Sequence, residues 1–255
     1  MSSLAHHPVL LLAVSFPVLW LSTWIGAVLS RRLRTELESA HDDFTVVQGA
    51  TLTLLALIVG FTFSMAVTRY DQRKNYEEAE ANAIGTEFVR ADLLPPADAA
   101  KVRALLLQYL GQRILYYTAQ DPHELEQVDS RTATLQKELW SAVVAPGLAQ
   151  PTVVSALAVA GMNDVLNSQG YTTAAWLNQI PEGAWRMMVV IAVCSTLLIG
   201  VGARDTRVGR GLFVVLPAIL SIAFFLIADI DSPRYGVIRV VPQNLELLLP
   251  WMTGR

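Results

Sequence analysis

The sequence has 255 residues, of which 53% are apolar, a formal net charge of -3 and a mean hydropathy of +0.41. This composition, with its uninterrupted apolar runs, is typical of a polytopic membrane protein and not of an ordinary soluble one. The small net charge and the lack of a basic cluster interleaved with aromatic residues argue against a nucleic-acid partner. The single cysteine, Cys194, excludes an intrachain disulfide and is expected to be a small buried packing residue.

The first expected membrane span covers residues 8–30 and ends abruptly at Arg31, Arg32 and Arg34. No Lys or Arg precedes this apolar run, and it is longer than the core of a signal peptide. A retained transmembrane helix is therefore favoured over a cleaved signal.

The second expected span, residues 44–68, contains no charged residue, whereas residues 69–92 are rich in charged ones. No proline interrupts this stretch before Pro95. A helix over residues 44–95 would be about 75 Å long, whereas the hydrocarbon core of a bilayer is about 30 Å thick. We therefore expect one long helix that crosses the membrane and continues into water, so that residues 1–68 supply the first two spans.

Residues 69–182 are expected to form a helical extramembrane domain. Apolar residues at helical spacing predict an amphipathic helix over residues 97–120. Asp121 and Pro122 predict the N-cap and first position of a second helix that ends at Pro146-Gly147. A third helix is expected from Pro151 to about Gln169.

Residues 183–229 are expected to hold the third and fourth spans, at about 185–203 and 211–228, followed by an interfacial C-terminal tail at 230–255. The predicted fold class is therefore all-α, with four transmembrane helices and a helical extramembrane domain inserted between the second and third. A multi-pass protein of the cell (inner) membrane is the expected localisation.

Charges near the spans predict the orientation. The two short loops rich in arginine, residues 31–43 and 204–210, are expected in the cytoplasm, which places both termini and the helical domain on the outer side. The opposite orientation is favoured by basic residues beyond the second and fourth spans, namely Arg69, Arg73, Lys74, Arg234 and Arg239.

Several stretches resemble one known family. They are the run GFTFSMAVTRYDQRK at 60–74, the segments EANAIGT at 80–86 and ADLLP at 91–95, the His41-Asp42 pair with Gly49, and the D-x-D-x-P-x-x-G stretch from Asp229 to Gly236. Together they resemble the bestrophin-like family of four-span membrane proteins, which is remotely related to the bestrophin ion channels. The resemblance covers most of the chain and is weakest in the middle of residues 69–182.

This resemblance implies a homo-oligomer, pentameric by analogy with the bestrophins, whose pore is lined by the second span and carries inorganic ions. It also implies a helical domain in the cytosol, against the charge count. The chain has no run of consecutive acidic residues like the bestrophin calcium clasp, so calcium gating is not expected.

A strip along the second helix is a candidate pore lining. Gln48, Leu55, Thr62 and Arg69 recur every seven residues, with Thr51, Ile58 and Met65 on the neighbouring strip. In an oligomer these residues would line a path that is polar at its ends and apolar in the middle, a geometry that can gate by dewetting. The alternative is that the strip packs against helices of its own subunit. A second face with Thr53, Gly60 and Ser64 is expected to serve close helix packing.

Candidate charges at the pore mouths come from two places. Glu77 and Glu80 lie on the charged part of the long helix, where an exposed pairing of Arg73 with Glu77 is the alternative to a pore role. Asp229 and Asp231 follow the fourth span, where they would face a pore mouth or accept backbone N–H bonds at the helix end. The acidic set is the larger one, whereas Arg69 lies on the candidate pore strip. Cations are weakly favoured, since Asp229 or Asp231 would neutralise Arg69 if the fourth span packs beside the second.

Neither an enzyme nor a cofactor or metal site is predicted. The four histidines have no metal-binding spacing, and no nucleophile elbow or glycine-rich phosphate loop is present. Two functions remain from different classes. One is an oligomeric ion channel lined by the second span, and the other is a non-conducting membrane scaffold or sensor whose helical domain binds a partner.

Overall fold

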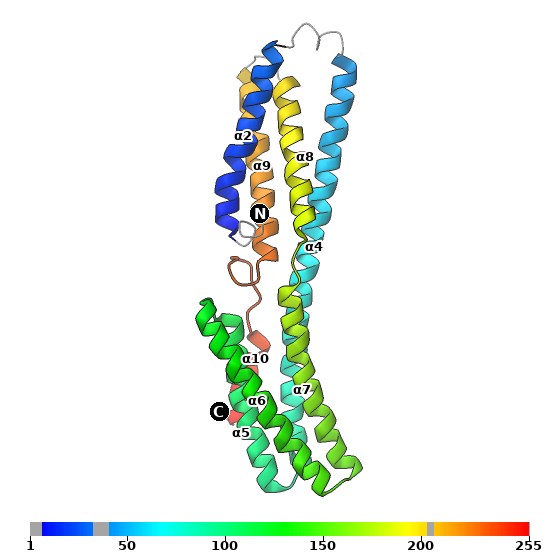
Figure 1. Ribbon diagram of the computed structural model, residues 1–255, viewed down its shortest axis with the longest axis vertical. Coiled ribbons are helices and arrows are strands. Elements are labelled where there is room, and N and C mark those ends of the chain that lie inside the picture. Colours follow the sequence, from blue (N-terminus) through cyan, green and yellow to red (C-terminus); the bar gives the residue numbers. More distant parts are fainter. Residues whose placement is uncertain (1–6, 33–40, 203–206, 255) are drawn as a thin grey trace. The chain divides into compact units, whose positions relative to one another are not determined.

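The computed structural model describes residues 7–32, 41–202 and 207–254, and this part of the chain is all-α (Figure 1). The longest helix is α4, which has 50 residues. In chain order the described elements are α2 (Pro8–Arg32), α4 (His41–Arg90), a 3-10 turn η1 (Ala91–Leu93), α5 (Pro96–Thr118), α6 (Pro122–Ala149), α7 (Val153–Leu177), α8 (Glu182–Gly202), α9 (Arg207–Asp231) and α10 (Gln243–Thr253).

The chain divides into two compact units. Unit 1 takes its described residues from Met1–Arg69 and Gln179–Arg239, and unit 2 from Tyr70–Asn178 and Val240–Arg255. The backbone of α4 is a continuous helix through the boundary between Arg69 and Tyr70, as expected from the absence of proline.

Four helical segments are long and apolar enough to cross a membrane, by length and composition: Pro8–Ser30, Asp43–Leu93, Val153–Gly202 and Phe213–Asp231. Each contains one of the four apolar runs expected from the sequence. The protein is therefore a multi-pass membrane protein with four candidate spans.

Unit 1 is held together by close contact between α2 and α8. A Cβ added to Gly26 would lie 2.1 Å from the carbonyl oxygen of Leu197, and one added to Gly200 would lie 2.0 Å from that of Thr23. Small residues thus let the two backbones approach closely. Close packing of this kind drives helix association inside a bilayer, where the hydrophobic effect between helices is absent. The Ser22 hydroxyl adds a hydrogen bond across the pair, 2.9 Å to the carbonyl of Val193.

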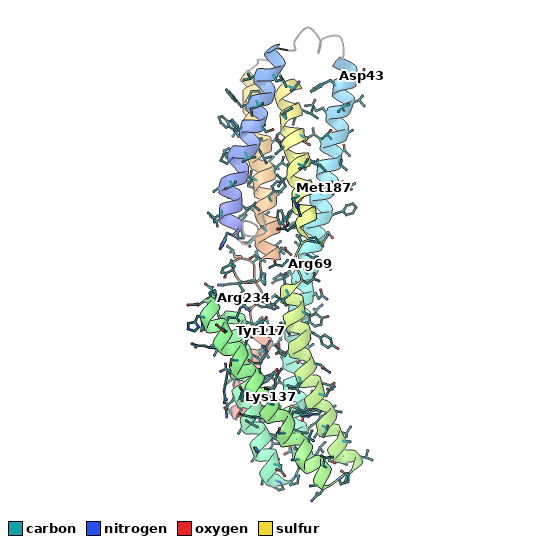
Figure 2. The ribbon with its side chains drawn as sticks, in the orientation of Figure 1. Asp43, Arg69, Tyr117, Lys137, Met187 and Arg234 are labelled. Atoms are coloured by element: carbon teal, nitrogen blue, oxygen red, sulfur yellow. The ribbon has the colours of Figure 1, made fainter. Side chains whose placement is uncertain are left out.

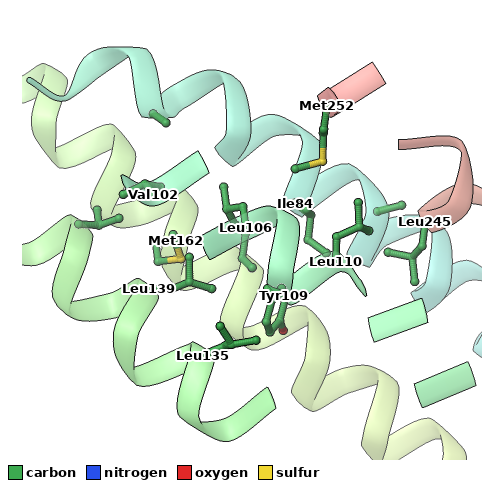
Figure 3. Close-up of a cluster of buried hydrophobic side chains, with 14 of the residues drawn as sticks. Ile84, Val102, Leu106, Tyr109, Leu110, Leu135, Leu139, Met162, Leu245 and Met252 are labelled. Carbon is green, nitrogen blue, oxygen red and sulfur yellow. The ribbon is translucent and has the colours of Figure 1, made fainter. Parts of the chain in front are cut away.

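Unit 2 has one hydrophobic core, to which α4, α5, α6, α7 and α10 contribute (Figure 3). Its centre contains fully buried side chains such as Ile84, Leu106, Leu110, Leu139 and Met162. The stripe of apolar residues expected on residues 97–120 is the face of α5 that enters this core. Burial of apolar faces such as this one supplies most of the free energy that stabilises the packed helices of unit 2.

Several expected helix ends lie elsewhere. The helix α6 continues through Pro146 to Ala149, because a proline in the last turn removes a single intrahelical hydrogen bond. The helix α7 runs to Leu177 instead of about Gln169, since Thr172 and Trp176 are buried and keep its last two turns packed. The predicted N-cap of α6 is confirmed: the Asp121 carboxylate accepts from the backbone N–H of His123 at 2.8 Å.

The last two spans also begin earlier than expected. The helix α8 starts at Glu182 and ends at Gly202, and α9 starts at Arg207, so that Arg207 and Arg210 belong to a helix and not to a loop. The expected loop residues Arg34 and Arg204 lie outside the described residues.

The expected C-terminal tail contains the helix α10, which the sequence analysis missed. Its Leu245 and Met252 are buried in the core of unit 2. Gly85 of α4 makes room for it, because a Cβ there would lie 3.1 Å from the side chain of Leu248. The part of the tail from Val240 onward therefore belongs to unit 2, whereas the residues up to Arg239 belong to unit 1.

Candidate functional site

The long helix α4 has a packed face and an open face along its whole described length. On the packed face, burial recurs at steps of three and four residues, the spacing of one side of a helix. The members of this face with less than one tenth of their surface exposed are Leu55, Thr62, Ala66, Arg73, Glu77, Glu80, Ile84 and Glu87.

The predicted pore strip coincides with this packed face in the membrane part of α4. Leu55 is 2% exposed and Thr62 3% exposed within the single chain. The Thr62 hydroxyl donates to the carbonyl of Ile58 at 2.7 Å, and that of Thr51 to the carbonyl of Val47 at 2.7 Å. This placement favours the alternative interpretation, in which the strip packs within its own subunit.

On the neighbouring strip, Thr51 and Ile58 are half-buried and Met65 is exposed. Gln48 is half-buried next to Gly202 of α8, where a Cβ added to the glycine would lie 3.4 Å from the side-chain amide of Gln48. These residues border the packed face.

The open face lies on the opposite side of the same helix. Its residues also follow one another at steps of three and four, and they are small or hydroxyl-bearing more often than large. All are exposed in the chain: Val46, Ala50, Thr53, Leu57, Gly60, Ser64, Thr68, Asp71, Asn75, Glu78, Asn82, Thr86 and Val89.

Arg69 ends the membrane part of α4 and is already paired. Its guanidinium lies 3.6 Å from the Asp231 carboxylate of α9, with 14% of the side chain exposed (labelled in Figure 2). The expectation that an aspartate beside the fourth span neutralises Arg69 is confirmed for Asp231.

Asp229 and Asp231 both bind backbone N–H groups. Asp229 accepts from Val237 at 2.7 Å and from Ile238 at 2.8 Å, and Asp231 accepts from Ile180 at 2.9 Å. A Cβ on Gly236 would lie 2.2 Å from the carbonyl oxygen of Asp229, so this loop requires glycine. The D-x-D-x-P-x-x-G stretch is therefore the end of α9 with the loop that follows. Both carboxylates accept backbone N–H bonds at the helix end, as the second sequence interpretation predicted: Asp229 binds the chain after the loop, and Asp231 binds the backbone before α8.

Glu77, expected at an aqueous mouth or in an exposed pair with Arg73, is instead buried in unit 2. Its carboxylate accepts from the backbone N–H groups of Asn244 at 2.9 Å and Leu245 at 3.0 Å, and from the Asn244 side chain at 2.6 Å. It thus binds the first turn of α10, where an anion is favourable because the N–H groups there lack helical partners. Arg73 is also buried and donates to the carbonyl of Ala175 at 3.3 Å, so the expected exposure of these two side chains is wrong.

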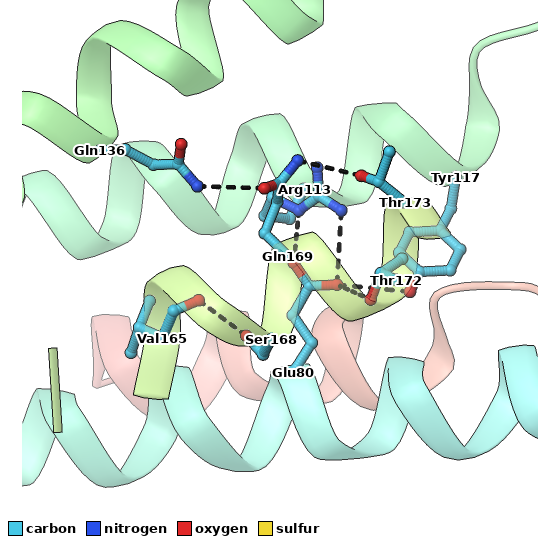
Figure 4. Close-up of polar contacts among 9 residues, drawn as sticks. All are labelled: Glu80, Arg113, Tyr117, Gln136, Val165, Ser168, Gln169, Thr172 and Thr173. Atoms are coloured by element: carbon cyan, nitrogen blue, oxygen red, sulfur yellow. Dashed lines mark hydrogen bonds and ion pairs between the residues drawn. The ribbon is translucent and has the colours of Figure 1, made fainter. Parts of the chain in front are cut away.

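Glu80 lies at the centre of a buried polar network (Figure 4). Arg113 of α5 binds its carboxylate through two nitrogens, and both side chains are 0% exposed. Tyr117 and Thr172 donate to the same carboxylate at 3.3 and 3.1 Å. One glutamate therefore connects α4, α5 and α7.

The electrostatics of this network keep the Arg113 guanidinium charged and the Tyr117 phenol neutral. Burial lowers the pKa of the Arg113 guanidinium, but the Glu80 carboxylate and the neighbouring Tyr109 and Tyr117 together outweigh burial, so the pKa is raised. Burial, followed by the negative charge of Glu80, raises the pKa of the Tyr117 phenol. The guanidinium also lies 4.4 Å from the ring centre of Tyr116, a favourable cation–π distance.

Within the described ranges, no group of three or more His, Cys, Asp or Glu side chains is arranged to hold a metal ion. Of the buried carboxylates, Glu77, Glu80, Asp229 and Asp231 instead meet backbone N–H groups, hydroxyls or arginine. The chemistry that this arrangement offers is ion pairing and hydrogen bonding between helices.

The sequence of the chain matches one known family over most of its length. The model of the bestrophin-like domain matches residues 14–245. The chain belongs to the bestrophin-like family. No curated protein matches this bestrophin-like chain.

Solved structures show the same fold. A variant of a bacterial bestrophin homolog from Klebsiella pneumoniae is 14% identical, with 96% of this chain and 99% of that chain covered and a TM-score of 0.69. A second variant of that homolog is 13% identical, covers 96% and 97% of the two chains and has a TM-score of 0.68. A structure of that homolog phased on zinc is 14% identical, with 93% of this chain and 98% of that chain covered and a TM-score of 0.65.

The sequence analysis of this bestrophin-like protein missed the partners of the buried carboxylates. Two signals were present. Arg113 falls on the apolar stripe of α5, between Tyr109 and Tyr117, and Ile84 continues the spacing of Glu77 and Glu80 on α4. Charged residues in register with an apolar stripe indicate buried pairs.

Proposed function

We propose that this bestrophin-like protein is a homo-oligomeric ion channel whose pore is lined by the open face of α4. The observation that carries the proposal is that the residues of this face stay exposed in the chain over its described length, although α4 is the longest described helix. The helices next to it only border the face, α9 at Gly60 and α10 at Asn82, Thr86 and Val89. A single subunit of four spans does not enclose a water path, whereas several copies of this face can surround one. A pentamer is the expected assembly by analogy with the family.

The chemistry of the open face suits a narrow aqueous path. Between Val46 and Thr68 it holds no charge, and Thr53, Gly60 and Ser64 offer small or hydroxyl-bearing surfaces. Leu57 would form an apolar ring between them, a place where a pore can gate by dewetting. Thr51, Ile58 and Met65 would flank this path, whereas Leu55, Thr62 and Arg69 serve the packing of the subunit.

The open face also supplies fixed charge, beyond the membrane part of the helix. Asp71 and Glu78 are exposed on it, and Lys74 lies to one side. A unit charge 4 Å from an ion contributes about 1 kcal/mol in bulk water and about 4 kcal/mol at an effective dielectric of 20, and a ring of several copies multiplies this effect. Since Arg69 is paired with Asp231, we propose a weak preference for cations.

Unit 2, with the insert 69–182, is proposed to lie outside the bilayer of the inner membrane. The charge count places it with both termini on the outer side, whereas the family resemblance implies the cytosol. A reporter active only in the cytoplasm, fused after Gln120, distinguishes the two. The charge count predicts no signal from this reporter. A strong signal would establish the opposite orientation, with residues 69–182 in the cytosol.

Cysteine accessibility tests which face of α4 is wet. Cys194 is the single cysteine and is exposed on α8 instead of buried as expected, so Cys194→Ser gives a clean background. In this background Ser64→Cys should react with a small charged thiol reagent and change single-channel conductance in planar bilayers, whereas Thr62→Cys on the packed face should not. Reaction at Thr62→Cys alone would overturn the assignment of the face.

Selectivity is tested by neutralising the proposed ring. Asp71→Asn combined with Glu78→Gln should move the reversal potential toward anions in asymmetric salt, and most strongly at low ionic strength because salt screens exposed charge. The control is Glu126→Gln, an exposed glutamate of α6. An unchanged reversal potential with conductance intact would remove Asp71 and Glu78 from selectivity.

A non-conducting scaffold remains the second candidate, and one observation favours it. The α6–α7 junction exposes a group of apolar side chains, among them Leu148 at 76% and Val153 at 85%, next to Val154 and Leu157. An exposed apolar patch on a water-facing unit is a place where another protein binds. The absence of single-channel currents from purified oligomer in bilayers would favour this candidate.

A further inference from the structure

Glu87 is the one buried carboxylate of α4 in unit 2 for which the described residues supply no hydrogen-bond partner. Its side chain is 0% exposed, and neither carboxylate oxygen accepts a hydrogen bond. Glu77 and Glu80, on the same face, each have several donors. An unpartnered buried carboxylate is costly when ionised, so its presence calls for an explanation.

The carboxylate lies in a notch that a glycine of α7 provides. A Cβ added to Gly161 would lie 2.1 Å from Oε2 of Glu87 and 2.5 Å from Nη1 of Arg90. The two side chains of α4 therefore border the same small space at the contact with α7. No hydrogen bond joins them.

Arg90 has another partner at this contact. Its Nη1 lies 3.9 Å from the Asp164 carboxylate of α7, and these side chains are 34% and 67% exposed. The pair therefore bridges α4 and α7 at the edge of unit 2, and water reaches it. This edge gives a proton of Glu87 a short route to solvent.

We propose that Glu87, Arg90 and Asp164 form a pH-sensitive switch at the contact between α4 and α7. With Glu87 protonated, Arg90 pairs with Asp164 and bridges the two helices. When Glu87 releases its proton to water, the new carboxylate attracts Arg90, which is one turn along the same helix, and the bridge to Asp164 opens.

The charges around Glu87 agree with this switch. Burial raises the pKa of Glu87 to about 8. The positive charge of Arg90 lowers this pKa and the negative charge of Asp164 raises it, but both effects are smaller than that of burial. From α5, Arg103 reaches this turn of α4, but it is engaged with Asp92 and with the carbonyl of Phe88. A midpoint in this range makes Glu87 mostly neutral at pH 7 and ionised in alkaline conditions.

Hydrogen exchange of the purified protein tests the switch without reference to conduction, so it goes beyond the proposed function and does not depend on it. Peptides that contain Gly161 should lose protection about tenfold between about pH 7 and about pH 9.5, after correction for the intrinsic exchange rate. Glu87→Gln, which keeps the shape of a neutral side chain, should abolish this loss. Glu78→Gln, an exposed glutamate of the same helix, is the matched control and should retain it.

The two partners of the bridge give a readout that a merely structural role of Glu87 would not move. Asp164→Asn and Arg90→Gln each remove the bridge at every pH. In both variants, peptides that contain Gly161 should therefore exchange at about pH 7 as fast as those of the wild type at about pH 9.5, with no further loss of protection as the pH rises. A flat wild-type profile, or a pH-dependent loss that persists in Glu87→Gln, Asp164→Asn or Arg90→Gln, would overturn the proposal.

Discussion

Arg113→Met is the most severe single change that the structure predicts in unit 2. It removes the cation from the network and leaves the Glu80 carboxylate 0% exposed, with Tyr117 and Thr172 as its remaining donors. Breaking a buried pair by removing one partner costs about 3–5 kcal/mol, because the other charge stays in a medium of low dielectric. For a unit of this size the expected loss in melting temperature is about 10–20 °C.

The double variant Arg113→Met with Glu80→Gln tests the physical reason. The amide oxygen of glutamine can still accept from Tyr117 and Thr172, and no charge is left buried. The double variant should therefore be more stable than Arg113→Met alone, with a coupling energy of a few kcal/mol in the cycle.

Thermal unfolding of the purified protein, together with hydrogen exchange of core peptides from α5, measures both effects. Lys101→Met is the control, since Lys101 is exposed on the same helix and its replacement should change stability by no more than about 0.5 kcal/mol. The reasoning would be refuted by a loss below about 1 kcal/mol in Arg113→Met, or by a double variant no more stable than the single one.

Three further changes give separate tests. Gly200→Ala should prevent α2 and α8 from packing together, since the added methyl group would lie 2.0 Å from a carbonyl oxygen. The control is Gly183→Ala on the same helix: a Cβ there has no atom within 4 Å, so this variant should have the melting temperature of the wild type. Glu77→Gln should weaken the cap of α10 by about 1 kcal/mol and speed its cleavage by protease, and unchanged cleavage would contradict the cap. Glu87→Gln should stabilise unit 2 increasingly as the pH rises from about 4.5 to about 8, because in this range folded wild-type protein keeps a proton on Glu87 that the unfolded chain releases. The gain in the free energy of unfolding, at most about 4 kcal/mol, should vanish near pH 4. A gain independent of pH would contradict the assigned burial of Glu87.

The features that the sequence predicted well are those that depend on composition along the chain. Uncharged runs identify the four candidate spans, since a bilayer accepts little else. The absence of proline between Phe44 and Leu94 predicts the unbroken α4, and Asp121-Pro122 predicts the start of α6. These signals are local, so no knowledge of neighbouring helices was needed.

The faces of α4 were harder to assign, because a heptad strip has the same appearance whether it meets its own subunit or another. Leu55 and Thr62 proved to be packed within the chain, and the face with Gly60 and Ser64 proved to be open. Helical spacing gives the two sides of a helix but not the identity of what covers each side.

By itself the sequence determined the class of the protein, the number of candidate spans and the family, since hydropathy and motifs are written along the chain. Tertiary structure alone decided the partners of the charged residues. Glu77, Glu80 and Glu87 look alike in the sequence, yet one binds a helix N-terminus, one binds Arg113 and one has no hydrogen-bond partner among the described residues. The difference arises because burial and pairing depend on residues up to 168 positions away, which are brought together only when the helices pack.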